Sequence, residues 1–263
     1  MQLGIIGTGA IGTYVRDKAI ENGHTVAALL LRPERLSKSG ALARQFKCVG
    51  DVADLPDDLD IMVDCAGHAA LRSLGPDILQ RGADLVTVSL GALADADAYN
   101  RLLQAARNGG TRLHLPSGAI GALDCLQAGR VGQLSRVVYT GRKPPQGWRG
   151  SPAETRLDLD NLTAGAETHF SGTARSAALE YPKNANVAAA VALAGIGFDD
   201  TRVKLVADPD ISENIHEIQA TGDFGSFVFE IRGNALPDNP RSSALAAMSV
   251  ISKLEQREQP ISF

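Results

Sequence analysis

The sequence predicts an α/β fold in which a doubly wound parallel sheet is followed by a second, α+β domain. Three observations support this prediction. Apolar strands and helical stretches alternate over residues 1–115, a glycine-rich turn joins the first strand to the first helix, and the alternation ends after Pro116. Helices that cross over the faces of a sheet between parallel strands give this alternation.

The first domain is expected to contain six strands. Residues 2–6 form a short apolar strand, and a helix follows to about Asn22. Thr25–Leu31 is a continuous apolar run, as in a parallel strand that is buried on both faces. Further strands are expected at residues 46–49, 60–65, 84–90 and 111–115, and helices at residues 69–81 and 95–108. We assign residues 1–115 to this domain.

Residues 116–239 are expected to form the α+β domain. Asn186–Gly195 is rich in Ala and Val on all sides, which predicts a buried helix. Strands are expected at residues 136–142, 201–207, 213–221 and 226–232, and a loop at 143–152. The last two strands flank a Gly-Asp-Phe-Gly turn and form a hairpin. A helix within residues 240–263 is expected to pack back on the first domain.

Composition excludes several classes of protein. The 263 residues are 44% hydrophobic and 21% charged, which is typical of globular domains rather than disordered chains. A net charge of −4 provides no cationic field for a nucleic-acid backbone, so no nucleic-acid partner is expected. The sequence contains no recognisable signal peptide and no apolar run long enough to span a bilayer, so we expect a cytoplasmic protein with no membrane partner.

The cysteines do not predict a metal site. Cys48, Cys65 and Cys125 are odd in number and widely spaced, and no CxxC pair occurs. A zinc knuckle or a disulfide framework is therefore not expected.

The turn after the first strand reads Gly-Thr-Gly-Ala-Ile-Gly over Gly7–Gly12. The first glycine permits a tight turn, the second lets a pyrophosphate approach the backbone, and the third lets the helix pack closely on the strand. We therefore expect a Rossmann-type dinucleotide site, rather than a glycine-rich turn without a ligand. The expected contacts are Gly7, Gly9, Ala10, Ile11 and Gly12.

The end of the second strand bears on the choice of cofactor. It reads Leu-Leu-Leu-Arg-Pro-Glu-Arg, so no acidic residue precedes Glu34. An acidic residue here would bind the ribose hydroxyls of NAD, whereas Arg32, aided by Arg35, can bind a 2′-phosphate. Both arginines can equally lie on a solvated loop. We expect that NADP is accepted and that NAD is also usable.

A second candidate cofactor contact follows the fourth strand. Ala66, Gly67 and His68 lie at the carboxyl end of that strand, where open α/β sheets bind their ligands. His68 is either a neighbour of the cofactor or an ordinary residue at the start of a helix.

Several stretches of the chain resemble the L-aspartate dehydrogenase family. They are Gly7–Gly12, Ala66–Ala70, Leu115–Asp124, Arg142–Pro145, Tyr181–Ala189, Ala207–Pro209, Asn214–Ile218 and Asn239–Ala244. The resemblance covers nearly the whole chain. Its most specific part is the Tyr-Pro-Lys-Asn-Ala-Asn segment followed by Asn-x-His.

The resemblance implies the reversible, NAD(P)-dependent oxidation of L-aspartate to iminoaspartate, which hydrolyses to oxaloacetate and ammonia. Iminoaspartate can feed biosynthesis of the nicotinamide cofactor. The resemblance also implies a homodimer, in which the second domain serves substrate binding and dimerisation. It assigns the active-site histidine to His216. It assigns further cofactor contacts to Ser117, Ala119, Ile120 and Asn186.

These residues suit such roles chemically. An imidazole, with an ordinary pKa near 6.5, can exchange the proton of an amine at neutral pH. On a strand, His216 shares a face with Ile218 and Ala220, and Glu217 points the other way. An isolated strand histidine is otherwise more often a structural residue.

A dicarboxylate needs cationic or amide donors at both ends, and the start of the buried helix can supply some of them. Lys183, Asn184 and Arg241 are the candidates. The alternatives are helix capping by the asparagine and solvated surface charges for the two cations.

Two other functions compete with this interpretation. One is a related dihydrodipicolinate-type or homoserine-type reductase, which the Asn-Ile-His-Glu-Ile stretch disfavours. The other is a dinucleotide-binding sensor without turnover, which a fold alone never excludes.

Overall fold

The computed structural model describes residues 1–182, 184–236 and 239–261. The chain divides into two compact units, one formed by Met1–Pro116 with Ala246–Phe263 and the other by Ser117–Leu245. The boundaries expected from the sequence, 115/116 and 239/240, lie one residue and six residues before these.

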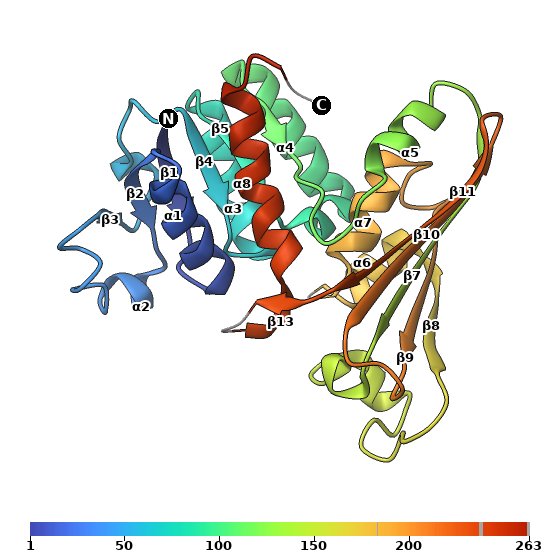
Figure 1. Cartoon of the computed structure of the whole chain (residues 1–263). Helices are drawn as coiled ribbons and strands as arrows, with labels where there is room; N and C mark the ends of the chain where they lie inside the picture. The colour runs from blue at the N-terminus through green and yellow to red at the C-terminus, as the bar shows by residue number, and fades with distance from the viewer. Residues whose placement is uncertain (183, 237–238, 262–263) are drawn as a thin grey trace. The chain divides into compact units, whose positions relative to one another are not determined.

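The first unit is built on a six-stranded parallel sheet in the order β3-β2-β1-β4-β5-β6 (Figure 1). Its strands are β1 (Gln2–Ile6), β2 (Thr25–Leu30), β3 (Lys47–Val49), β4 (Ile61–Asp64), β5 (Asp84–Thr87) and β6 (Leu113–His114). Its helices are α1 (Ala10–Glu21), α2 (Pro33–Leu36), α3 (His68–Gln80), α4 (Ala96–Gly109) and α8 (Ala244–Glu258). This strand order is that of the doubly wound dinucleotide-binding fold, so the expected fold class is confirmed.

The core of the first unit explains why α8 belongs to it. Leu3, Ile5 and Val63, from the two central strands, are almost fully buried. They form one hydrophobic cluster with Val250 and Leu254 of α8. The sheet is thereby covered by a helix that lies more than a hundred residues beyond its last strand.

The second unit is built on a five-stranded mixed sheet in the order β11-β10-β7-β9-β8 (Figure 1). Its strands are β7 (Leu134–Lys143), β8 (Glu167–Thr173), β9 (Arg202–Ala207), β10 (Asn214–Gly222) and β11 (Gly225–Gly233), and β12 (Ala235–Leu236) pairs separately with β13 (Asn239–Ser243). Its helices are α5 (Leu123–Gly129), α6 (Ala174–Glu180) and α7 (Asn186–Ala194). Helix α6 contacts β8 and β9, and α7 contacts β7.

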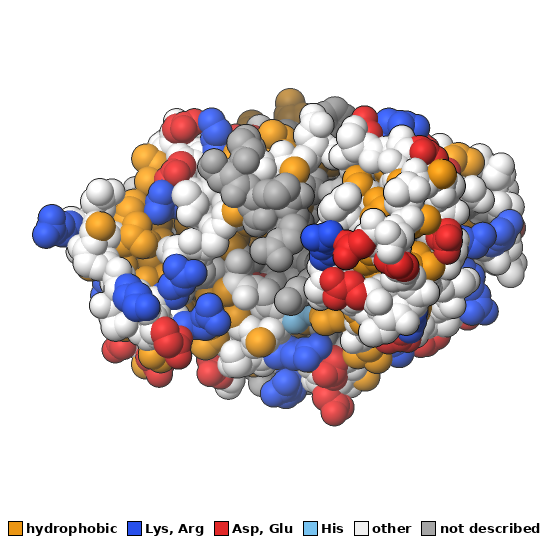
Figure 2. All heavy atoms as spheres, turned by 90° about the horizontal axis from the view of Figure 1, so that it is seen from below, with side chains coloured by type: hydrophobic (Ala, Val, Ile, Leu, Met, Phe, Trp, Pro, Cys, Tyr) orange, Lys and Arg blue, Asp and Glu red, His pale blue; other side chains and the backbone are white. Residues whose placement is uncertain are grey.

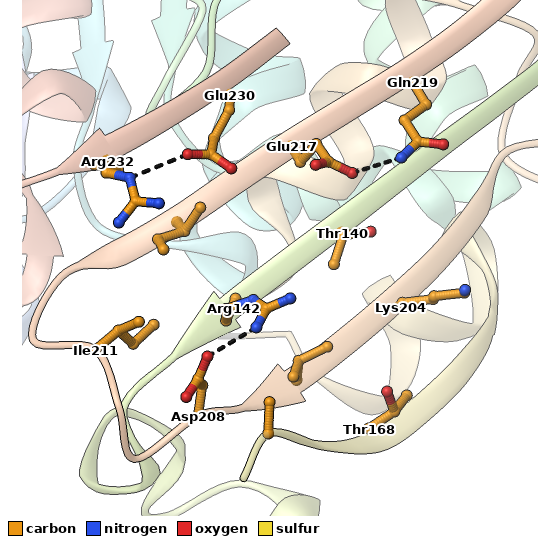
Figure 3. A pocket seen from close by; sticks show the side chains of 13 residues that line it. Thr140, Arg142, Thr168, Lys204, Asp208, Ile211, Glu217, Gln219, Glu230 and Arg232 are labelled. Carbon is orange, nitrogen blue, oxygen red and sulfur yellow. Dashed lines mark hydrogen bonds and ion pairs between the residues drawn. The ribbon is translucent and has the colours of Figure 1, made fainter. Parts of the chain in front are cut away.

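The two faces of this sheet differ in polarity. Val203, Leu205 and Ile218 are buried on the face toward α6 and α7. The other face presents polar side chains around a hollow (Figure 3), where Arg142 pairs with Asp208 at 2.7 Å and Gln219 donates to Glu217 at 2.8 Å. Strand alternation places these side chains opposite the buried ones. Glu217 therefore points away from the helix-covered face, as its position next to His216 predicts.

Part of the second unit is not apparent in the sequence. Strand β8 contains a bulge between Thr168 and Phe170, which interrupts the alternation that would indicate a strand. Trp148, in the expected loop 143–152, is almost fully buried and donates from its indole nitrogen to the carbonyl of Val206 at 3.0 Å. The loop is therefore folded onto the sheet.

On the face drawn in Figure 2, Lys and Arg side chains are interspersed with Asp and Glu.

Within residues 1–182, 184–236 and 239–261, no helix has the length and apolar character that crossing a membrane requires. The same residues contain no cluster of three or more His, Cys, Asp or Glu side chains arranged for a metal ion.

Candidate active site

His216 is the third residue of β10, a strand that lies between β7 and β11, and it is on the face that α6 and α7 cover. Its side chain is 5% exposed. Its Nδ1 lies 2.8 Å from the phenol oxygen of Tyr139 on β7, and the two rings are stacked with their centroids 6.0 Å apart. Among the described residues, none hydrogen-bonds Nε2. The second ring nitrogen is therefore the atom available to a substrate.

Gly141 explains how the phenol reaches the imidazole. It pairs with His216 across the two strands, and it lies two residues from Tyr139 on the same face of β7. A Cβ atom at position 141 would lie 2.7 Å from the Tyr139 hydroxyl oxygen. The absence of a side chain at this position leaves room for the phenol to cross it.

Burial controls the charge of both rings. Burial, with the positive charge of Lys143 as a second cause, lowers the pKa of His216 to about 3. Burial also raises the pKa of Tyr139 above its ordinary value. Both groups are therefore neutral at pH 7. For Nε2 to accept a proton, Nδ1 must carry the hydrogen of this pair and donate it to the phenol oxygen.

Lys143, at the end of β7, was not among the residues expected from the sequence. It shares the face of Tyr139 and Gly141, and its Nζ donates to Oδ1 of Asn184 at 3.0 Å. The ammonium also lies 5.1 Å from the centre of the Trp148 ring. Burial lowers the pKa of Lys143 to about 8, so the cation persists at neutral pH. Lys143 lies two residues after Gly141 and four residues after Tyr139. A predicted strand that ended at residue 143 instead of 142 would have placed Lys143 on their face.

The expected substrate residues have different outcomes. Asn184 is half-buried in the turn before α7 and bonds to Lys143. Lys183 lies outside the described residues. Arg241 is in β13, but its side chain is likewise outside what the structure describes. Asn186, an expected cofactor contact, is the first residue of α7 and is half-buried.

The glycine-rich turn of the first unit fits a dinucleotide. Gly7 has φ +89°, a conformation that favours glycine, and a Cβ at Gly12 would lie 2.3 Å from the carbonyl oxygen of Gly7. A Cβ at Gly9 would meet nothing within 4 Å, so the space beside this residue is open. Helix α1 begins at Ala10 without a side-chain cap and without an acidic residue in its first turn. Its free amide groups can therefore receive a pyrophosphate.

A buried carboxylate organises the neighbouring strand ends. Asp64, the last residue of β4, accepts hydrogen bonds from Thr87 Oγ1 at 2.7 Å, Ser89 Oγ at 2.7 Å and the amide of Ala66 at 2.9 Å. Burial raises the pKa of Asp64, and the three donors oppose this shift. These bonds hold the turn through Gly67, which has φ +96°, and so fix the start of α3 at His68.

The remaining expected cofactor contacts lie before the starts of two helices, α2 and α5. Arg32 is exposed just after β2 and precedes Pro33, the first residue of α2. Ala119 and Ile120 are buried in the turn before α5, and Ser117 is half-buried. Both interpretations of Arg32, as a phosphate ligand or a solvated cation, fit its exposure.

Comparisons with known proteins cover both units. Residues 124–257 match the family model of the aspartate dehydrogenase C-terminal domain, and residues 3–116 match that of the homoserine dehydrogenase NAD-binding domain. The chain is 53% identical to an L-aspartate dehydrogenase of Ruegeria pomeroyi over 257 residues, which is 98% of this chain and 92% of that protein. It is 43% identical to one of Pseudomonas aeruginosa over 263 residues, which is 98% of each.

Solved structures give the same result. The aspartate dehydrogenase of Thermotoga maritima superimposes with a TM-score of 0.76 at 27% identity, covering 100% of this chain and 99% of that one. An archaeal homoserine dehydrogenase in complex with NADPH has a TM-score of 0.60 at 12% identity, covering 98% of each chain. The second likeness shows the fold alone.

The contact between Gly141 and Tyr139 predicts a specific loss of stability. Gly141→Ala should lower the free energy of unfolding by about 1–3 kcal/mol, because the new methyl group displaces the phenol. Removing the hydroxyl with Tyr139→Phe should recover part of that loss in the double variant. Denaturant unfolding of the four proteins measures both effects.

Gly40→Ala is the matched control, since a Cβ there meets nothing within 4 Å. If Gly141→Ala cost no more than Gly40→Ala, or if Tyr139→Phe recovered nothing, the crowding of these two residues would be disproved.

Proposed function

The chain belongs to the L-aspartate dehydrogenase family, and we propose that His216 is the base of its NAD(P)-dependent oxidation of L-aspartate. In this reaction L-aspartate and NAD(P)⁺ give iminoaspartate, NAD(P)H and a proton, and water converts the imine to oxaloacetate and ammonia. The observation that supports the role of His216 is its pairing with Tyr139 on a buried face, which leaves Nε2 available.

The first task of the base is to free the lone pair of the substrate nitrogen. A hydride leaves Cα only when this lone pair can form the C=N double bond. Nε2 of His216 takes the proton from the ammonium group, while Nδ1–H donates to the phenol oxygen of Tyr139. The hydrogen bond thus fixes the ring orientation and the tautomer that the transfer requires.

The second task is hydrolysis of the imine. Hydride loss from the neutral amine leaves a protonated imine, whose carbon is already electrophilic, and the protonated imidazole releases its proton to solvent. The neutral ring can then accept a proton from the attacking water. One imidazole thus serves both steps, and Tyr139 keeps it in place throughout.

A bound nicotinamide supplies the hydride acceptor for this chemistry. On the first unit, we propose contacts from Gly7, Gly9, Ala10, Ile11, Gly12, Arg32, Ala66, Gly67 and His68. On the second unit, we propose contacts from Ser117, Ala119, Ile120 and Asn186. The open space at Gly9 and the uncapped start of α1 support the pyrophosphate contacts.

We also propose that the protein forms a homodimer and works in the cytoplasm. Support for the dimer is the family resemblance and the exposed edge strand β11, on which Val228 is 67% exposed. The cysteines Cys48, Cys65 and Cys125 are all free thiols, which suits a reducing compartment. Sedimentation equilibrium tests the dimer, and the mass of a single chain at micromolar concentration would contradict it.

The proposed role of His216 predicts a large catalytic effect from a small change. His216→Asn should lower kcat for L-aspartate by about 10²–10⁴-fold, because no group takes the ammonium proton. Cofactor affinity, measured by NADH fluorescence, should stay unchanged. Glu217→Gln is the matched control, since this neighbour faces the opposite side of the sheet and should change kcat less than twofold. If His216→Asn lost less than tenfold in kcat, a group other than His216 would have to take the ammonium proton.

The position of Arg32 predicts a change of cofactor preference. Arg32→Asp should raise the KM for NADP by about tenfold or more and affect NAD less, because a carboxylate repels a 2′-phosphate and can bind ribose hydroxyls. Steady-state assays with each cofactor measure the ratio. Arg107→Asp, at an exposed position near the end of α4, controls for the change in net charge. Equal effects on the KM values for NADP and NAD would show that Arg32 does not contact the 2′-phosphate.

A further inference from the structure

We propose that Lys143 and Asn184 bind the side-chain carboxylate of the substrate and so restrict the enzyme to dicarboxylic amino acids. This inference rests on the proposed function of His216. It keeps Asn184 from the candidates that the sequence suggests and adds a cation, Lys143, that the sequence did not indicate.

The position of Lys143 is the first support. Strand β7 places Lys143 on the same face as Tyr139, whose phenol bonds the imidazole of His216. From there its Nζ reaches Asn184, in the turn that begins α7. The pair therefore joins the sheet that bears the base to the helix that covers it.

The second support is the missing counter-charge. Among the described residues, no carboxylate pairs with Lys143. Its neighbour Arg142 points to the open face and pairs with Asp208. A half-buried cation without an anion is unfavourable, because it has lost part of its hydration and gained no charge partner. A carboxylate that arrived with the substrate would remove this cost.

The donor set fits a carboxylate. One of the three hydrogens of the Lys143 ammonium is used by Asn184, which leaves two. Because Oδ1 of Asn184 is the acceptor of that bond, its Nδ2 group is directed elsewhere and keeps two donors. An ammonium and an amide side by side can each donate to one carboxylate oxygen. The Trp148 ring covers another side of the ammonium.

The pair formed by Lys143 and Asn184, which we call the anchor, also affects the base His216. The charge of Lys143 is one cause of the low pKa of His216, after burial. A carboxylate bound to Lys143 would cancel that charge and so raise the pKa of the imidazole. A dicarboxylic substrate therefore makes His216 a better base, and an amino acid without the second carboxylate does not.

The pH range of the anchor follows from the groups around it. Lys143 loses its charge as the pH rises through about 8. Tyr139 and His216, the titratable groups on its face, are neutral at pH 7, and His169, in contact with Trp148, has a pKa lowered to about 4 by burial. Carboxylate binding should therefore weaken above pH 8, and none of the other three groups named here changes charge between pH 7 and 9.

Succinate is the probe, because it has both carboxylates and no amine. We expect Lys143→Met, in the NADH-bound enzyme, to weaken succinate binding by about 10- to 100-fold in calorimetry while NADH affinity is unchanged. In the wild type succinate affinity should fall between pH 7.5 and 9, and in Lys143→Arg it should stay level because guanidinium remains charged. Lys204→Met is the matched control, an exposed lysine on the opposite face of the same sheet.

Substrate preference gives the second readout. Lys143→Met should lower kcat/KM for L-aspartate by at least tenfold and should not lower the value for L-alanine, which has no second carboxylate for Lys143 to bind. If Lys143→Met does not fold, Asn184→Ala should still weaken succinate by about threefold or more.

The anchor is disproved if Lys143→Met and Lys204→Met bind succinate equally well, or if the preference for L-aspartate survives. Either result would still be compatible with the proposed role of His216, provided that His216→Asn is inactive. If instead His216→Asn retained its turnover, the proposed function would fail whatever succinate does.

Discussion

The site depends on the burial of one imidazole against one phenol. His216 and Tyr139 come from adjacent antiparallel strands, and their 2.8 Å contact lies on the face of the sheet that α6 and α7 cover. Burial keeps both rings uncharged at neutral pH. A neutral imidazole whose Nδ1 is held by a phenol has a defined orientation and one open nitrogen, which is what proton transfer at a substrate amine requires.

The other features of the second unit support this pair. Gly141 leaves space for the phenol, and the folded segment around Trp148 limits water near Lys143. On the opposite face of the sheet, Arg142 pairs with Asp208 and Arg232 pairs with Glu230. The first unit contributes a different element, a glycine turn with an uncapped helix start, whose geometry is set within residues 7–12.

The features that could be predicted from the sequence are those set by a few neighbouring residues. Strand alternation put His216 and Glu217 on opposite faces, and the glycine spacing placed the turn before α1. Lys143 and Tyr139 could not be found in this way, because their partners lie 41 and 77 residues away and depend on strand register and the α7 turn. Asp64 was missed for the same reason, since Thr87 and Ser89 belong to the next strand and its end.

The most direct test of this account is the titration of His216 in protein labelled with ¹⁵N-histidine, with its signals assigned by their loss in His216→Asn. The account predicts a neutral ring with the same tautomer from pH 7.5 down to pH 4.5. An imidazole that instead titrated near pH 6.5, as in water, would show that the ring is neither buried nor held by Tyr139.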